Sequence, residues 1–83
     1  MKIYEVYIDY QFDRVTPQEI EYFIEKQNAI NRFNELKNSM NPDWELDDEY
    51  DEEDITDVNN CILFTHKGSG EECYIEIYEI EVK

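Results

Sequence analysis

The chain has 83 residues, of which 22 are Asp or Glu and seven are Lys or Arg, so its formal net charge at pH 7 is −15. This length allows a single domain with a small core, over residues 1–83. Hydrophobic residues make up 41% of the chain and aromatic residues 14%, a content too high for a disordered polymer. Like-charge repulsion disfavours direct binding to nucleic acid or to anionic lipid.

The first predicted element is a strand from Lys2 to Phe12. Apolar and polar residues alternate along it with the period of two that a half-buried strand shows. One face would carry Tyr4, Val6, Ile8, Tyr10 and Phe12, and the other Glu5, Tyr7 and Asp9. Residues 13–17 then interrupt the pattern.

Residues 16–40 allow two interpretations. Thr16 and Glu19 have the spacing of a helix capping box, with Pro17 at the first helical position, which favours one helix from Pro17 to about Met40. At 100° per residue, however, its two apolar groups would point in nearly opposite directions. These groups are Ile20, Phe23 and Ile24, and then Ala29, Ile30, Phe33, Leu36 and Met40.

The alternative is a strand followed by a shorter helix, and we prefer it. The strand would run from Glu19 to Glu25, with Ile20, Tyr22 and Ile24 facing inward, and the helix from about Gln27 to Ser39. A kinked or doubly packed long helix stays open. In either case residues 38–42 end the helix, because the proline at 42 disfavours helical geometry at the residue before it.

Residues 43–57, named here the acidic segment, hold ten of the chain's carboxylates. No Lys or Arg occurs between Lys37 and Lys67, so nothing local in the sequence neutralises the segment. Adjacent like charges repel, and we expect Asp47 to Asp54 to be weakly structured when free, with Trp44 and Tyr50 pinning the segment to the body. A solvated loop that only keeps the protein soluble is the competing interpretation.

Two strands are predicted after the acidic segment. Asn59 and Asn60 close the segment, and a strand follows from Cys61 to His66, with Ile62 and Phe64 on one face. Residues 67–71 form a turn, and the last strand runs from about Glu72 to Val82. Its inward set changes from Ile75 and Ile77 to Ile80 and Val82, which predicts a bulge near Tyr78 or Glu79.

The two cysteines are expected to be reduced. A turn centred on the Gly-Ser-Gly at 68–70 would pair Thr65 with Cys73 and Cys61 with Ile77, so the two sulfurs would not face each other. Free thiols are expected in the cytoplasm, which keeps cysteines reduced. No apolar run reaches the roughly 20 residues of a membrane span, and the N-terminus has no signal-peptide pattern, so we expect a cytoplasmic protein.

Together these elements predict a small α+β fold. The expected sheet is antiparallel, with three or four strands, one main helix and the acidic segment as an excursion. The preferred element order is ββαββ, and βαββ is the alternative that the long helix would give.

No pattern of catalytic residues is present, so we expect no enzyme activity. The single histidine, His66, has no Ser or Cys at a diagnostic spacing. A calcium loop needs a glycine at its sixth position, and residues 47–54 contain no glycine. We expect no cofactor and no dedicated metal site.

The acidic segment approaches the charge density of DNA. A duplex carries about one negative charge per ~1.7 Å of axis. Ten charges over fifteen residues give about one per ~2.2 Å in a helix and about one per ~5 Å in a strand. Either geometry fits a groove lined with Lys and Arg.

A very short, acidic α+β chain whose Asp/Glu-rich excursion contains Trp and Tyr resembles the small phage-encoded inhibitors that imitate DNA. These include type II anti-CRISPR proteins and the acidic inhibitors of uracil-DNA glycosylase. The element order, with Phe33-Asn34-Glu35-Leu36-Lys37 near the end of a helix, is also similar to small proteins of Gram-positive phages. The resemblance implies an inhibitor of a basic nucleic-acid-binding protein, such as a CRISPR nuclease, in the cytoplasm of the host cell.

The residues expected to bind such a partner lie in the acidic segment. They are Trp44, Glu45, Asp47, Asp48, Glu49, Tyr50, Asp51, Glu52, Glu53, Asp54 and Asp57. The carboxylates would pair with arginines and lysines of the target, and the aromatic residues, with Leu46 and Ile55, would slow its release. Two alternatives stay open: an antitoxin or adaptor that binds through a sheet edge or an aromatic face, and an enzyme or metal buffer.

Overall fold

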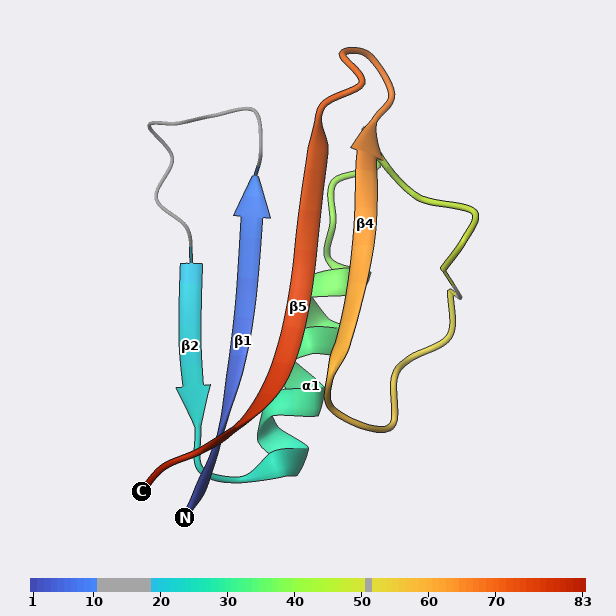
Figure 1. The fold of residues 1–83 in the computed structure, drawn as a ribbon. Coiled ribbons are helices and arrows are strands. Elements are labelled where there is room, and N and C mark those ends of the chain that lie inside the picture. Colours follow the sequence, from blue (N-terminus) through green and yellow to red (C-terminus); the bar gives the residue numbers. More distant parts are fainter. Residues whose placement is uncertain (11–18, 51) are drawn as a thin grey trace.

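The computed structural model describes residues 1–10, 19–50 and 52–83, and it confirms the α+β class (Figure 1). The elements are β1 (Lys2–Tyr10), β2 (Glu19–Phe23), α1 (Lys26–Asn38), β3 (Trp44–Leu46), β4 (Asn60–His66) and β5 (Glu72–Glu81). All strand pairs are antiparallel, and the sheet order is β2-β1-β5-β4-β3. The sheet has five strands rather than the predicted three or four. The additional strand is the short β3, which forms inside the acidic segment.

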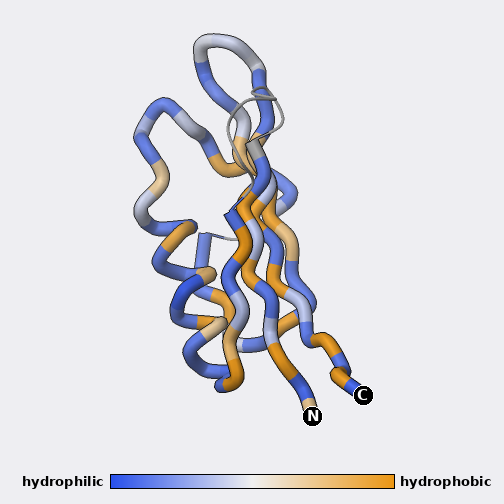
Figure 2. The backbone as a smooth tube through the Cα atoms, turned by 90° about the vertical axis from the view of Figure 1, so that its left-hand side faces the viewer, coloured by the Kyte–Doolittle hydropathy of each residue, from blue (hydrophilic) through white to orange (hydrophobic). Residues whose placement is uncertain are grey.

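The fold has two layers, with α1 on one face of the sheet (Figure 2). The core lies between them, where Phe33, Ile75, Ile77 and Cys73 are fully buried. The alternation predicted for β1 is confirmed, since its helix-side residues Tyr4, Val6 and Ile8 are buried. Phe12, at the predicted end of that strand, lies outside the described residues. In the part of the chain that is described, no helix is both long and apolar enough to span a bilayer.

Strand β2 and helix α1 confirm the preferred strand-then-helix interpretation, and the single long helix was wrong. The expected capping box at Thr16 lies outside the described residues. The predicted inward face of the strand was also wrong: Ile20, Tyr22 and Ile24 are 43%, 60% and 72% exposed.

The pairing register explains this reversed face. Phe23 lies opposite Tyr4 and Glu21 lies opposite Val6, so the odd-numbered residues of β2 face α1. There Arg32 of α1 donates to the Glu21 carboxylate at 2.8 Å. The apolar residues at even positions therefore point to the side of the sheet that α1 does not cover.

The β4–β5 hairpin differs from the prediction by one residue. Phe64, rather than Thr65, lies opposite Cys73, and Asn60, rather than Cys61, lies opposite Ile77. A four-residue loop at 67–70 causes the shift, because His66 N–H donates to the Glu71 carbonyl and closes it. Both cysteines are free, as expected.

The bulge predicted in the last strand is absent, since β5 pairs with β1 without interruption from Cys73 to Glu81. Ile80 therefore stays on the face opposite to that of Ile75 and Ile77. The apolar residues of the last strand change from odd to even positions in the sequence because the sheet has apolar residues on both faces, and no bulge is needed to explain it.

These burial differences predict opposite outcomes for two truncations. Phe33→Ala should lower the free energy of unfolding by about 3–5 kcal/mol, because it removes a fully buried ring. Ile24→Ala should change it by no more than about 0.5 kcal/mol, because that side chain is exposed. Urea denaturation of the two variants measures both values, and equal losses would contradict the burial described here.

Candidate functional site

The acidic segment begins as an ordered part of the sheet. Trp44 of β3 lies opposite His66 of β4, and their rings meet edge to face with centroids 5.0 Å apart. The His66 Nδ1 atom accepts hydrogen bonds from the backbone N–H groups of Gly68 and Ser69 at 3.2 and 3.3 Å. The histidine thus shapes the β4–β5 turn and supports the tryptophan.

The chain turns sharply after β3. The Asp47 N–H donates to the Leu63 carbonyl at 2.9 Å, and the Asp47 carboxylate accepts from the Glu49 N–H at 3.0 Å. Tyr50 N–H returns to the Asp47 carbonyl, and its side chain packs against the core. A shallow depression of about 190 Å³ lies here, lined by Glu45, Leu46, Asp47, Asp48 and Thr65.

Lys37 of α1 fixes the middle of the segment. Its Nζ atom donates to the Glu52 carbonyl at 2.8 Å and lies 3.0 Å from the Asp54 carboxylate. The lysine side chain is only 4% exposed. Asn38 also donates to Asp54, and this hydrogen bond, followed by the Lys37 ammonium, lowers the pKa of Asp54. A buried cation of the helix therefore needs the acidic segment as its partner.

A side-chain amide holds the next residue through its backbone. Asn34 of α1 donates to the Ile55 carbonyl at 3.1 Å and accepts from the Ile55 N–H at 2.9 Å. Two complementary bonds of this kind satisfy both backbone polar groups of one residue, as a neighbouring strand would. The Ile55 side chain packs against the core.

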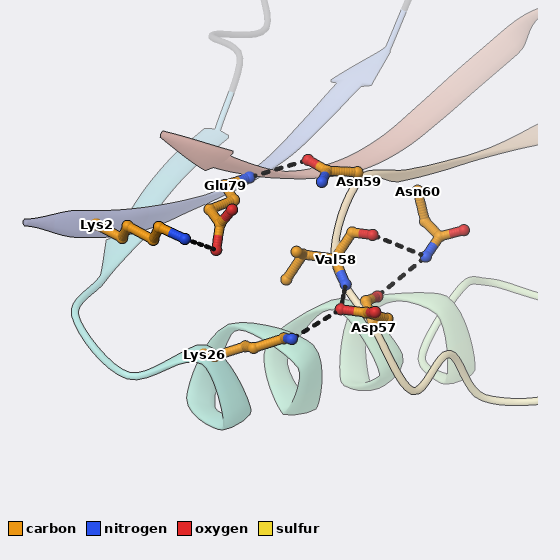
Figure 3. Close-up of polar contacts among 7 residues, drawn as sticks. All are labelled: Lys2, Lys26, Asp57, Val58, Asn59, Asn60 and Glu79. Atoms are coloured by element: carbon orange, nitrogen blue, oxygen red, sulfur yellow. Dashed lines mark hydrogen bonds and ion pairs between the residues drawn. The ribbon is translucent and has the colours of Figure 1, made fainter. Parts of the chain in front are cut away.

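Lys26, at the start of α1, fixes the end of the segment (Figure 3). Its ammonium lies 2.9 Å from the Asp57 carboxylate, which also accepts from the Val58 N–H. The hydrogen bond to Lys26 lowers the pKa of Asp57 and raises that of Lys26. The Asn60 side chain donates to the Asp57 carbonyl.

Asn59 then returns the chain to the sheet. Its φ of 63° is left-handed, a conformation that asparagine tolerates better than most residues. Its side-chain oxygen accepts from the Glu79 N–H of β5 at 3.1 Å (Figure 3). Asn59 and Asn60 therefore close the segment, as predicted.

The described residues of the acidic segment thus lie against one side of the core, tied to it by contacts with α1. Helix α1 holds it with four side chains, Lys26, Asn34, Lys37 and Asn38. The sequence gives the segment no Lys or Arg of its own, but the fold pairs two of its carboxylates with lysines of α1. Lys37 lies on the apolar side of the helix, and this was the one sequence signal for the anchor.

The predicted partner-binding residues divide into two groups. Trp44 and Tyr50 are half-buried and pack against the core, and Asp47 is also partly buried. Asp51 lies outside the described residues. The others present exposed carboxylates at the surface, and they are Glu45, Asp48, Glu49, Glu52, Glu53, Asp54 and Asp57.

The sequence suggested an aromatic binding face only as a general alternative and did not identify its residues. In the described part of the chain, no helix or strand covers the sheet face opposite α1, which we name the open face (Figure 2). Strand register places fifteen side chains on it: Ile3, Glu5, Tyr7, Asp9, Ile20, Tyr22, Glu45, Cys61, Leu63, Thr65, Glu72, Tyr74, Glu76, Tyr78 and Ile80. Four are tyrosines and five are carboxylates. The alternation of Glu5, Tyr7 and Asp9 in the first strand was a signal of this surface.

Tyrosines and carboxylates are paired on the open face. The Tyr74 hydroxyl donates to Glu72 at 3.0 Å, and the Tyr78 hydroxyl donates to Glu76 at 2.9 Å. The bond to Glu76, followed by burial, raises the pKa of Tyr78 to about 12. Burial, followed by a hydrogen bond with Asp9, raises the pKa of Tyr7 to about 12. Each ring therefore lies beside a carboxylate.

The described residues contain no group of three or more His, Cys, Asp or Glu side chains placed to hold a metal ion. No protein-family model matches the chain, and no curated protein or solved structure matches it either. The acidic segment and the open face are therefore the two candidate functional surfaces of the protein.

The Lys37 anchor predicts a stability difference between two lysine variants. Lys37→Met keeps the apolar stem but leaves the Glu52 carbonyl without its donor, and it should lower the free energy of unfolding by about 1–3 kcal/mol. It should also speed amide hydrogen exchange at Ile55. Lys26→Met breaks an exposed pair with Asp57 and should cost less. Equal stability of the Lys37 variant and the wild type would contradict the anchor.

The tyrosines of the open face predict a loss of stability in alkali. A tyrosine whose pKa is about 12 in the folded state and 10.0 when unfolded binds more protons folded than unfolded between those values. The free energy of unfolding should therefore fall as the pH rises above about 10. Phenolate absorbance should show a late step that Tyr7→Phe and Tyr78→Phe remove. Titration of every tyrosine near 10 would contradict this prediction.

Proposed function

We propose that the protein is an inhibitor whose acidic segment occupies the nucleic-acid-binding surface of a basic protein. A guide-loaded CRISPR nuclease is the target class that we put forward first. Such nucleases hold nucleic acid in a positively charged channel and read a short duplex motif through arginines. An inhibitor of uracil-DNA glycosylase would act by the same physical means on another target.

The attachment of the acidic segment to α1 is the observation that carries the proposal. Because Lys37 and Asn34 hold the backbone at Glu52 and Ile55, the carboxylates nearby are displayed from a fixed surface. A fixed surface loses less conformational entropy on binding than a mobile tail does. The segment keeps its charge outward, since Asp48, Glu49 and Glu52 are exposed.

The proposed mechanism is electrostatic competition. The net charge of −15 steers the protein toward a cationic channel and raises the association rate. Inside the channel, carboxylates pair with the arginines and lysines that otherwise hold phosphates and base edges. Nucleic acid is then excluded while the inhibitor stays bound, and added salt weakens the block.

Reversal of three exposed carboxylates tests the proposal. Asp48→Lys, Glu49→Lys and Glu52→Lys together change the net charge from −15 by six units, to −9. The inhibitor concentration required to block DNA cleavage by the guide-loaded nuclease should rise by at least about 100-fold. The reason is that each lost ion pair becomes a repulsion. The fold should survive, as none of these side chains is buried.

A matched triple variant is the control. Glu19→Lys, Glu25→Lys and Glu71→Lys also change the net charge by six units, but all three positions are exposed and lie outside the acidic segment. This variant should keep most of the inhibition. If both variants lose inhibition equally, bulk charge is responsible, and if neither loses it, contact is made elsewhere; either result overturns the proposal.

One observation favours a second candidate function. The open face, with tyrosines such as Tyr22 at 60% exposure, is a surface that an adaptor or antitoxin would use for a partner. In that case substitutions of tyrosine would weaken binding to the partner, and the triple reversal in the acidic segment would not.

A further inference from the structure

The open face combines two kinds of binding group in alternating rows. One row across the sheet is Tyr22, Glu5 and Tyr78, and the next is Ile20, Tyr7, Glu76 and Cys61. Tyr78 therefore has Glu5 beside it across the strands and Glu76 beside it along β5, with its hydroxyl bonded to Glu76. Aromatic rings with carboxylates at their edges recur over the whole middle of the face.

Charge on the open face has one sign. Its described strand positions include five carboxylates and no Lys or Arg. At its end near the chain termini, Ile3 lies opposite Ile80. The face thus offers negative charge and aromatic rings in the middle, with an aliphatic patch at one end.

Charge decides which occupant fits this face. Nucleic acid and anionic lipid are repelled by the carboxylates. Two copies of the chain packed face to face would bring two sets of five carboxylates together without a basic residue from the described positions of either copy. A polypeptide that carries positive charge has no such penalty.

We propose that the open face binds an arginine-bearing polypeptide segment, as a second interaction surface that shares only Glu45 with the acidic segment. A guanidinium group is planar, so it stacks on a tyrosine ring while its edge N–H groups donate to the carboxylate beside that ring. Tyr78 with Glu5 and Glu76, and Tyr74 with Glu72, supply such pairs of ring and acceptor. The aliphatic end of the face takes the apolar residues of the same segment.

This chemistry predicts a preference for arginine over lysine. An ammonium group is compact and cannot stack and form a two-pronged hydrogen bond at the same time. A synthetic peptide with five arginines alternating with glycine should bind the full chain about three- to tenfold more tightly than the matching lysine peptide. Isothermal titration calorimetry measures both affinities, and NMR shifts should concentrate at β1 and β5 rather than at residues 47–57.

Two double variants of equal charge separate this surface from the general charge of the protein. Glu5→Gln with Glu76→Gln removes two charges from the open face, and Glu49→Gln with Glu52→Gln removes two from the acidic segment. The open-face pair should weaken binding of the arginine peptide by at least about fivefold. The acidic-segment pair should change it by less than about twofold.

The tyrosines are tested separately. Tyr74→Leu with Tyr78→Leu should abolish the preference for arginine while leaving the affinity for the lysine peptide nearly unchanged. Circular dichroism checks that each variant is folded, and Tyr78→Phe, which keeps the ring, should retain most of the preference.

Three results would overturn the inference. They are equal affinity for the two peptides, equal effects of the two double variants, and a concentration-dependent dimer in sedimentation equilibrium that an Ile80→Lys substitution dissociates. The peptide experiment uses no nuclease, so it can fail while the acidic segment still inhibits, and the reverse.

Discussion

The ammonium of Lys37 joins the acidic segment to the core of the protein. It is buried at the end of α1, and its partners are a backbone carbonyl and a carboxylate of the segment. A buried cation without partners lowers the free energy of unfolding. The ten carboxylates within the fifteen residues of the segment lower it as well, because they repel one another. Each therefore relieves the cost of the other, and Trp44, Tyr50, Ile55 and Val58 can close over the core.

This arrangement gives the two faces of the sheet different roles. On one side, α1 and the acidic segment cover the core, so the exposed carboxylates of the segment lie over a rigid support. On the other side the sheet has no cover from the described residues, and tyrosines there are bonded to carboxylates. Both surfaces are negative, but the segment presents mainly charge, whereas the open face presents rings as well.

The sequence predicted those features that depend on local periodicity. The alternation in β1 identified Tyr4, Val6 and Ile8 as core residues, and the apolar stripe of α1 identified Phe33. What it could not predict depends on contacts between distant residues. The 21-residue separation of Asn34 and Ile55 leaves no periodic signal, and a side chain such as lysine at position 37 gives no sign of which backbone carbonyl it will reach.

The orientation of β2 and the β4–β5 register were predicted wrongly for a related reason. A strand with apolar residues on both faces does not reveal which face meets the helix, and in β2 the pairing of Arg32 with Glu21 stands on the helix side. In the hairpin, the loop has four residues instead of the predicted five, and this difference moves every cross-strand partner by one residue. The surface carboxylates of the candidate site were predicted from charge alone, but the open face requires the sheet order.

The pairing of β1 with β5 governs when the fold can be completed. Lys2 lies opposite Glu81, so β1 pairs with the last of the described strands, which is far from it along the chain. Closing a loop between strands so far apart in the sequence is slow compared with the formation of local hairpins and helices. Among the described elements, β2 and α1 are the neighbours of β1 that are made before β5, so the central β1–β5 pairing forms only after β5 has left the ribosome.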